Sequence, residues 1–158
     1  CWNQVLDSQW TVDEFDYQAS VITPTVEGEQ KNAWGYVAFN LGNTATSYTA
    51  DCAAASNREE DGFFTGSEEY ACTLSEVAPE GAAVAFKYTR ATGLLVIKDT
   101  ILCSEEGTTA TFIAKGTTQL SLECTDETTE TEEYSDRQIK CTPVDTYLRP
   151  EQVVGKEE

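Results

Sequence analysis

Histidine is absent from this 158-residue chain. Without it, neither a Ser-His-Asp nor a Cys-His catalytic arrangement can form, and only Ser-Lys variants stay open. The cysteines include no C-x-x-C pair, so the zinc-finger, zincin and thioredoxin patterns lack ligands or spacing. The G-x-S-x-G, P-loop and G-x-G-x-x-G motifs are missing as well. These absences argue against the enzyme classes that carry such signatures.

Basic residues are also few, since 10 Lys and Arg stand against 28 Asp and Glu, for a net charge of −18. Nucleic-acid binding depends on neutralising phosphate charges with Lys and Arg, so we expect no nucleic-acid partner. An anionic membrane surface is disfavoured for the same reason. The longest apolar runs, such as Gly93–Ile97, are far shorter than a membrane-spanning helix. We therefore expect no membrane partner either.

The cysteines are even in number and widely spaced. A chain of this length can bury a hydrophobic core, and its cysteines then suit a secreted domain that has both a core and disulfides. The sequence starts on a cysteine, which we interpret as the mature form left after removal of a secretory leader. We therefore expect a secreted, extracellular protein. The cysteines are Cys1, Cys52, Cys72, Cys103, Cys124 and Cys141.

Short segments of alternating apolar and polar residues, separated by Gly, Asn, Thr and Ser clusters, dominate the chain. At intervals of roughly ten residues, they predict an all-β fold, a single compact antiparallel β-barrel or sandwich stapled by disulfides. Helical periodicity is hard to find, with one turn at most at Ala53–Asn57. We expect one domain over residues 1–158, with a frayed C-terminal tail at about 150–158.

The strand patterns lead to finer expectations. In the first strand, Trp10, Val12 and Glu14 would share one face. Further along, segments 109–116 and 118–124 would form a hairpin about Gly116. Most strand aromatics are expected to fill the core. These aromatics are Trp2, Trp10, Trp34, Tyr36, Phe39, Phe86 and Phe112.

Several segments stand in a telling order: "WTVDEF" with Tyr17 nearby, "AWGYVAFNLGNTATSYTADCAAAS", "EEYACTL", "TGLLVIKD", and then Cys124 and Cys141 with "VDTY" just beyond. In that order they resemble the Alt a 1 family, the major-allergen family of Alternaria, whose opening strand is Trp-x-(Ile/Val)-x-Glu-Phe. No single motif is specific. The resemblance rests on collinearity from Trp10 to Leu148.

The resemblance implies a secreted fungal protein with a compact β-barrel. Members of the family include allergens, elicitors of plant cell death or defence, and effectors that meet plant defence proteins. No enzymatic activity is common to them, so we expect a non-enzyme. Binding of small phenolic ligands and of plant pathogenesis-related proteins has been proposed within the family.

The resemblance also implies two disulfides, Cys52–Cys72 and Cys124–Cys141. In the dimeric allergen a cysteine near the N-terminus links two chains, and Cys1 stands at about that place. Cys103 has no expected counterpart in the family, so a Cys1–Cys103 bond would leave no thiol unpaired. Because that bond would use Cys1 within the chain, the covalent dimer would not form. We therefore expect a monomer.

The segment "NREEDGFFTGSE" partly fits the calcium-binding loop of an EF-hand, with Asn57, Glu59, Asp61 and Glu68 as candidate ligands. Asn replaces Asp at the first ligand position, Glu stands at the third, and the flanking helices of an EF-hand are missing. The alternative is an exposed acidic loop closed by a disulfide. We expect no cofactor, with calcium in this loop as the weaker alternative.

The segment from Cys124 to Cys141 contains six carboxylates. In an extended strand they alternate between faces and do not converge, which favours a soluble hairpin held at its base over a metal site. Three of its carboxylates, Glu130, Glu132 and Glu133, are candidate partner-binding residues.

Phe63 and Phe64 are further candidates for partner binding. Two adjacent phenylalanines in a loop cannot easily both point inward, so one of them would be an exposed anchor. Alanine at either position would then leave the fold intact.

The leading hypothesis is a secreted fungal effector or elicitor-like protein that binds a host plant defence protein in the apoplast, without catalysis. A net charge of −18 would favour a basic partner and speed the encounter. Two alternatives stay open. One is a barrel or cleft that carries a small phenolic ligand, and the other is a carboxylate-based hydrolase.

Overall fold

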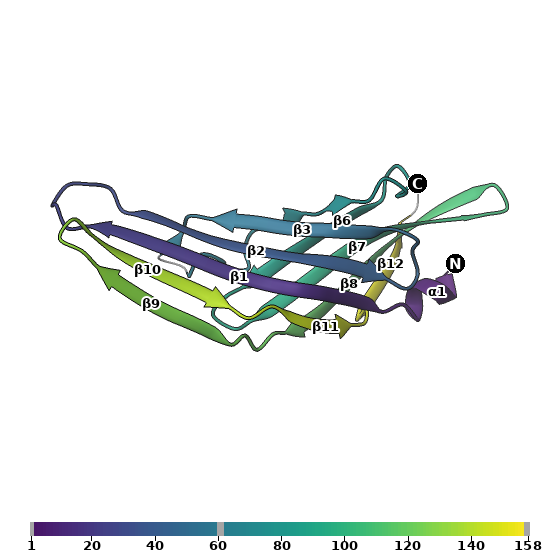
Figure 1. Ribbon diagram of the computed structural model, residues 1–158. Coiled ribbons are helices and arrows are strands. Elements are labelled where there is room, and N and C mark those ends of the chain that lie inside the picture. The colour runs from purple at the N-terminus through teal and green to yellow at the C-terminus, as the bar shows by residue number, and fades with distance from the viewer. Residues whose placement is uncertain (1, 60–61, 157–158) are drawn as a thin grey trace.

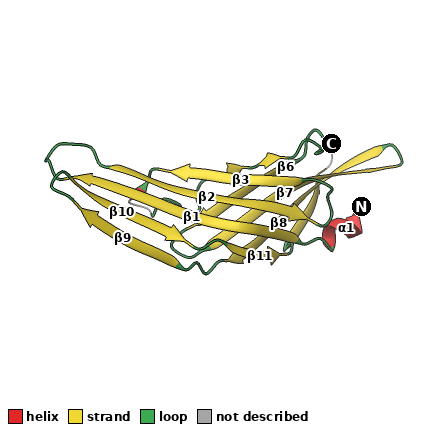
Figure 2. Cartoon of the chain, viewed as in Figure 1, coloured by secondary structure: helices red, strands yellow, loops and turns green. Residues whose placement is uncertain are grey.

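The computed structural model describes residues 2–59 and 62–156. Within them the chain forms one short helix, α1 (Trp2–Leu6), and two antiparallel β-sheets (Figures 1 and 2). No helix in this part of the chain is long and apolar enough to span a membrane.

The larger sheet has seven strands, in the order β5-β3-β2-β1-β10-β9 with β11 beside β1. The long strand β1 pairs with β2 along most of its length. On its other side, the first part of β1 pairs with β11 and the last part pairs with β10. The bounds are β1 (Trp10–Pro24), β2 (Asn32–Asn43), β3 (Thr49–Ser56), β5 (Thr73–Leu74), β9 (Cys124–Glu130), β10 (Tyr134–Cys141) and β11 (Val144–Leu148).

The smaller sheet has five strands, in the order β12-β8-β7-β6-β4. The hairpin of β7 and β8 extends beyond the rest of the molecule at the end where α1 lies (Figure 1). The bounds are β4 (Tyr70–Ala71), β6 (Ala83–Thr89), β7 (Leu94–Glu105), β8 (Thr108–Gln119) and β12 (Gln152–Lys156).

Alternate residues of the central strands fill the space between the two sheets. On β7, Leu95, Ile97 and Ile101 are buried, as the period-2 geometry of a strand with one covered face requires. Rings from opposite sheets meet there, and the centroids of Phe15 and Tyr88 are 5.0 Å apart. The predicted antiparallel all-β fold is confirmed as a sandwich, since the described strands do not close into a barrel.

One carboxyl group lies in this core. Asp99, on β7, is 1% exposed. Its Oδ2 accepts hydrogen bonds from Trp10 Nε1 and Asn43 Nδ2, both at 2.9 Å, which tie β7 to the other sheet. Burial raises the pKa of Asp99, and the two hydrogen bonds oppose that effect. Burial, together with the charge of Asp99, raises the pKa of Tyr48 to about 12.

A bulge in β1 moves Glu14 out of the core. The register of β1 with both β2 and β11 shifts here, and Glu14 has a φ of 54°. Its backbone N–H donates to Asp145 Oδ1 at 2.7 Å. The expectation that Glu14 shares a face with Trp10 and Val12 is therefore wrong. The extra residue in the bulge shifts the alternation by one, so that Phe15 is the next side chain to point into the core.

β8 runs straight through Gly116, so the hairpin predicted there is wrong. The turn lies at Glu106–Gly107, between β7 and β8. Gly116 is buried, and a Cβ at this position would come within 2.7 Å of both the Trp10 ring and the backbone oxygen of Arg149. Glycine is needed here for close packing between the sheets.

The expectation of a helical turn is wrong as well, whereas fraying of the tail at about 150–158 stays a prediction. Most of the segment 53–57, proposed as a helical turn, belongs to β3, and the helix is α1. The tail expected to be frayed contains β12, whose Val153 lies opposite Ala114 of β8 and packs against the core. In both places pairing with a neighbouring strand decides the structure, and local pattern does not reveal that partner.

Phe63 and Phe64 are both buried, with exposed fractions of 5% and 1%. The prediction that one of them is an exposed anchor is therefore wrong. Phe63 has a φ of 72°, and its ring packs so closely on Gly35 that a Cβ there would lie 2.6 Å away. The left-handed backbone at Phe63 turns two successive side chains into the same core, where Phe64 meets the edge of Tyr17.

Candidate protein-binding face

The outer face of the seven-stranded sheet, turned away from the five-stranded sheet, carries exposed aromatic side chains, two of them on β2. On β2, Val37 and Phe39 point into the core, whereas Trp34 and Tyr36 point outward. Their exposed fractions are 42% for Trp34 and 38% for Tyr36. Both were expected in the core. That expectation is wrong because aromatics occur on both faces of β2, and alternation alone does not say which face is covered.

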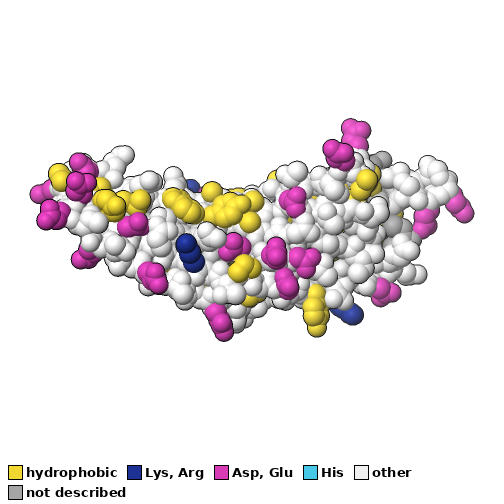
Figure 3. All heavy atoms as spheres, in the orientation of Figure 1, with side chains coloured by type: hydrophobic (Ala, Val, Ile, Leu, Met, Phe, Trp, Pro, Cys, Tyr) yellow, Lys and Arg dark blue, Asp and Glu magenta, His cyan; other side chains and the backbone are white. Residues whose placement is uncertain are grey.

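Small side chains flank these rings. In the pairing of β2 with β3, Tyr36 lies opposite Ala55, and Ala38 lies opposite Ala53. An alanine side chain ends at Cβ, so the Tyr36 ring is not covered from the side of β3. Figure 3 shows hydrophobic side chains gathered along this part of the molecule. We call Trp34, Tyr36, Ala38, Ala53 and Ala55 the aromatic strip.

An open groove of about 450 Å³ lies beside Tyr36. Asn40 donates a hydrogen bond to Asp51 at 2.7 Å, and Gln18 donates one to Asp16 at 3.1 Å. Among the described residues, no Lys or Arg lies within ion-pairing distance of the carboxylates that line the groove. No described Lys or Arg therefore neutralises their negative charge through an ion pair. These carboxylates, which we call the acidic groove, belong to Asp13, Glu14, Asp16 and Asp51.

A second acidic region lies at the end of the sheet formed by the β9–β10 turn. Glu130, Glu132 and Glu133 are all exposed there, and we call them the acidic tip. The hydroxyl of Thr25, in the β1–β2 loop, donates to the backbone oxygens of Glu132 and Glu133 at 2.7 and 3.0 Å. The two loops are thus held together, and Figure 3 shows acidic side chains clustered at that end.

The candidate calcium loop shows other contacts. Asn57 is exposed, and Asp61 lies outside the described residues. In the part of the chain that the structure describes, no group of three or more His, Cys, Asp or Glu is placed to hold a metal ion. Calcium binding by this loop stays a prediction. The two candidate glutamates form the ion pairs Lys31–Glu59 and Arg58–Glu68.

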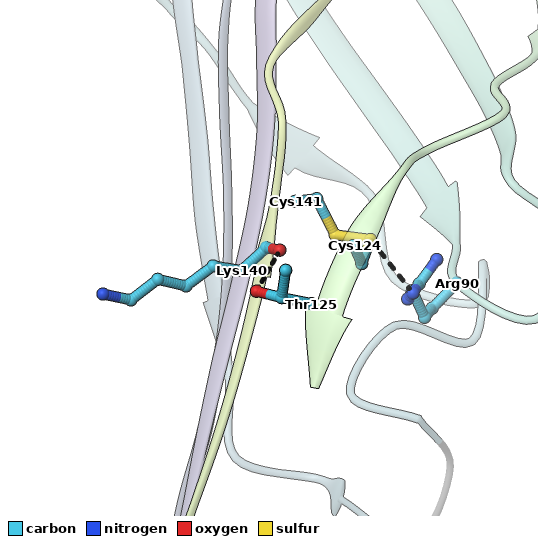
Figure 4. The surroundings of a disulfide bond; sticks show 5 residues. All are labelled: Arg90, Cys124, Thr125, Lys140 and Cys141. Carbon is cyan, nitrogen blue, oxygen red and sulfur yellow. Dashed lines mark hydrogen bonds between the residues drawn. A yellow bond between two sulfur atoms is a disulfide. The ribbon is translucent and has the colours of Figure 1, made fainter. Parts of the chain in front are cut away.

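Two disulfides join neighbouring strands. Cys124 and Cys141 lie directly opposite each other at the base of the β9–β10 hairpin, with their Cα atoms 3.9 Å apart (Figure 4). Cys52, on β3, is bonded to Cys72, with their Cα atoms 4.4 Å apart. Cys72 stands between β4 and β5, where the chain passes from the smaller sheet to the larger one. Both bonds are those that the family resemblance implies.

Cys103 lies on β7 and is 5% exposed. It is disulfide-bonded, whereas its expected partner Cys1 lies outside the described residues. The Cys1–Cys103 bond therefore stays a prediction.

Arg90 connects the two sheets next to the Cys124–Cys141 bond. Its Nη2 lies 3.7 Å from Cys124 Sγ (Figure 4). Its guanidinium carbon lies 4.6 Å from the centre of the Tyr17 ring, which is a cation–π contact. Burial raises the pKa of Tyr17, and the positive charge of Arg90 opposes that effect.

A comparison with protein-family models matches residues 12–141 to the family described as Alternaria alternata allergen 1. The chain belongs to the Alternaria alternata allergen 1 family. The match spans the aromatic strip, the acidic groove and both described disulfides, so the resemblance seen in the sequence is confirmed. Comparisons with curated proteins and with solved structures gave no match. Membership makes the chain an allergen-like fungal protein and favours a non-enzymatic role.

Sequence reasoning did not identify Trp34 and Tyr36 as exposed side chains. The sequence does contain a signal for the aromatic strip. On β2 the set of alternate residues that includes Val37 stays apolar as far as Leu41, whereas the set that includes Trp34 and Tyr36 turns polar at Asn40. The set that turns polar is the one that faces solvent.

Proposed function

We propose that this chain is a secreted fungal effector or elicitor-like protein that binds a basic host protein in the apoplast, without catalysis and without a cofactor. The observation that carries the proposal is the aromatic strip, which lies on an uncovered sheet face together with the acidic groove. Membership in an allergen-like fungal family supports a binding role.

Exposed tryptophan and tyrosine are the residue types that most often anchor protein interfaces, because a large rigid ring loses little conformational entropy when it is covered. Trp34 and Tyr36 are neighbours on alternate positions of one strand, so a single partner surface can cover both. Their faces also attract cations, and Arg is the commonest such partner. A partner rich in Lys and Arg could therefore place cations over the ring faces of Trp34 and Tyr36.

The charge of the molecule supports the same type of partner. Carboxylates of the acidic groove form no ion pair with a Lys or Arg that the structure describes, so they gain more from an approaching Lys or Arg than already paired carboxylates would. A net charge of −18 also draws a basic protein in from a distance, an effect that salt screens beyond about 10 Å at 0.1 M.

The alternative of a small phenolic ligand inside a barrel has less support. The described strands form a sandwich, and aromatic side chains such as Phe15, Phe39 and Tyr88 fill the space between its sheets.

The test is capture of proteins from host apoplastic fluid by the immobilised chain, followed by titration of each captured protein once it has been identified. A basic protein should bind wild type and lose affinity by roughly tenfold or more with Trp34→Ala or Tyr36→Ala, as expected for hot-spot residues. Its binding should also weaken steeply as salt is raised.

Trp2→Ala is the matched control, because Trp2 is also 42% exposed but lies on α1, at the end of β1 away from the β1–β2 loop (Figure 1). The affinity of Trp2→Ala for the captured protein should equal that of wild type. A captured protein whose affinity falls equally in all three variants, or in none of them, would contradict this assignment of the face. Thermal unfolding of each variant checks that the fold is intact.

A further inference from the structure

The two described disulfides differ in access. Cys124 is exposed at the sheet edge, although Cys141 is 6% exposed. In the other bond, Cys52 is 1% exposed and Cys72 is partly buried against the core. A thiolate must reach one sulfur to open a disulfide, so Cys124 offers an approach that neither sulfur of the second bond matches.

The surroundings of Cys124 favour negative charge on sulfur. Arg90 Nη2 lies 3.7 Å from its Sγ, and Figure 4 shows the guanidinium directed at that atom. No carboxylate in the described part of the chain lies within ion-pairing distance of Arg90. Its charge is therefore available to attract an incoming thiolate and to stabilise Cys124 as a thiolate after reduction, which makes the bond easier to reduce.

Apart from this bond, β9 is held in the sheet by its pairing with β10 and not by the core. Every residue of β9 is exposed, so the strand adds nothing to the core. β9 pairs with β10 alone, at the edge of the sheet, and one bidentate ion pair, Arg137–Asp126, supports the hairpin. An exposed ion pair contributes little to stability. The covalent bond thus closes the base of a hairpin whose other links are the β9–β10 backbone pairing and exposed side-chain contacts.

We propose that Cys124–Cys141 is a thiol-exchange site, which a small thiol such as glutathione opens before Cys52–Cys72, and that its opening releases β9 from the sheet. The incoming thiolate forms a bond with Cys124 Sγ, and the bond to Cys141 breaks. The electron pair leaves on Cys141, which then takes a proton from water. A second thiolate attacks the external sulfur of the mixed disulfide, which frees Cys124 and yields the oxidised small-molecule disulfide.

Release of β9 would uncover the backbone N–H and C=O groups of β10. An uncovered strand edge is a template for pairing with another extended segment. Thiol exchange would therefore replace β9, an edge strand rich in carboxylates, by β10 as the edge of the sheet.

The first test exposes the full oxidised chain to graded glutathione, blocks free thiols with an alkylating agent at set times, and locates the label by peptide mass spectrometry. Labels at Cys124 and Cys141 should appear at least tenfold faster than those at Cys52 and Cys72. Equal rates, or faster opening of Cys52–Cys72, would overturn the proposal.

The second test replaces Arg90. Arg90→Gln should slow the opening of Cys124–Cys141 several-fold, and Arg90→Lys, which keeps the charge, should restore most of the rate. A purely structural role predicts the opposite sign, because loss of the Tyr17 contact would loosen the hairpin and speed its opening. A faster or unchanged rate in Arg90→Gln would exclude the electrostatic role. Arg149→Gln, an exposed arginine beyond β11, is the control and should not alter the rate.

The third test measures amide hydrogen exchange before and after selective opening. Amides paired between β9 and β10 should lose protection, whereas those paired between β1 and β2 should keep it. Persistent protection of β9 after the bond has opened would show that the strand is not released.

Discussion

Asp99 places a carboxyl group where water cannot solvate its charge. Only one of its oxygens, Oδ2, accepts hydrogen bonds in the described structure, and its Oδ1 is buried without a partner, as is the Tyr48 hydroxyl. A small cavity of about 10 Å³, lined by both residues, is about the size that one water occupies. The cross-sheet link is therefore sensitive to the protonation of Asp99.

The effect of pH on this link has a definite sign. Burial raises the pKa of Asp99 above 3.8, so the folded chain keeps its proton at pH values where the unfolded chain has lost it. Stability from this group is thus fully present below pH 3.8 and is lost as pH rises through the folded pKa.

Asp99→Asn should be more stable than wild type at pH 7, because the amide still accepts from Trp10 and Asn43 and carries no charge to bury. The difference in free energy of unfolding should shrink as pH falls toward 4 (roughly the pKa of an unperturbed Asp). Urea unfolding of both proteins from pH 4 to 7 measures this. A difference that does not change with pH would show that Asp99 titrates normally.

At the scale of elements, the segment between β3 and β4 inserts Phe63 and Phe64 into the core, and we call these two residues the plug. Phe63 packs on Gly35 of β2, and the Phe64 ring meets Tyr17, Tyr70 and Tyr88. Phe64 thus contacts rings from both sheets. The Cys52–Cys72 bond closes this segment, which limits how far the plug can move from the core.

Phe64→Ala should lower the free energy of unfolding by about 3–5 kcal/mol, the range seen when a buried aromatic is truncated to alanine. Val77→Ala is the control, since Val77 is 68% exposed and its loss should change stability by about 0.5 kcal/mol at most. Urea unfolding under non-reducing conditions gives both values. A small effect at Phe64 would mean that the plug does not pack as described.

The elements also show where sequence patterns succeed and fail. The first strand was predicted because Trp10 and Val12 alternate with polar neighbours, and β7 because its start, "LLVI", is apolar on both faces. Both are local properties of the sequence. The bulge at Glu14 and the straight passage of β8 through Gly116 were missed. Both depend on groups distant in sequence, a carboxylate at Asp145 in one case and the Trp10 ring in the other.

For the whole molecule, the distribution of charge opposes self-association. Two copies that each carry −18 repel one another, and the exposed edge strand β9 adds Asp126, Glu127 and Glu130 at the place where a second sheet would pair.

The chain should therefore sediment as a monomer of 17.3 kDa at about 0.1 M salt under non-reducing conditions. Analytical ultracentrifugation, with a non-reducing gel beside it, measures this. A species of twice the mass on the gel would mean that a cysteine links two chains. A dimer in sedimentation alone would mean that a face of the sandwich is covered by a second copy.

The sequence by itself determined the fold class, the acidic surface and, through its family resemblance, the two described disulfides. The fold class and the acidic surface depend on composition and on period-2 alternation, whereas the disulfide pairing follows only from the resemblance. The acidic hairpin between Cys124 and Cys141 likewise followed from local charge.

Only the tertiary structure decided which face of each strand is covered. Alternation divides a strand into two sets of side chains, but the sheet that packs above it chooses the buried set. That choice placed Trp34 and Tyr36 in solvent and Phe63 and Phe64 in the core. It also left two sheets with free edges in place of a closed barrel, because closure depends on which strands meet at the edges.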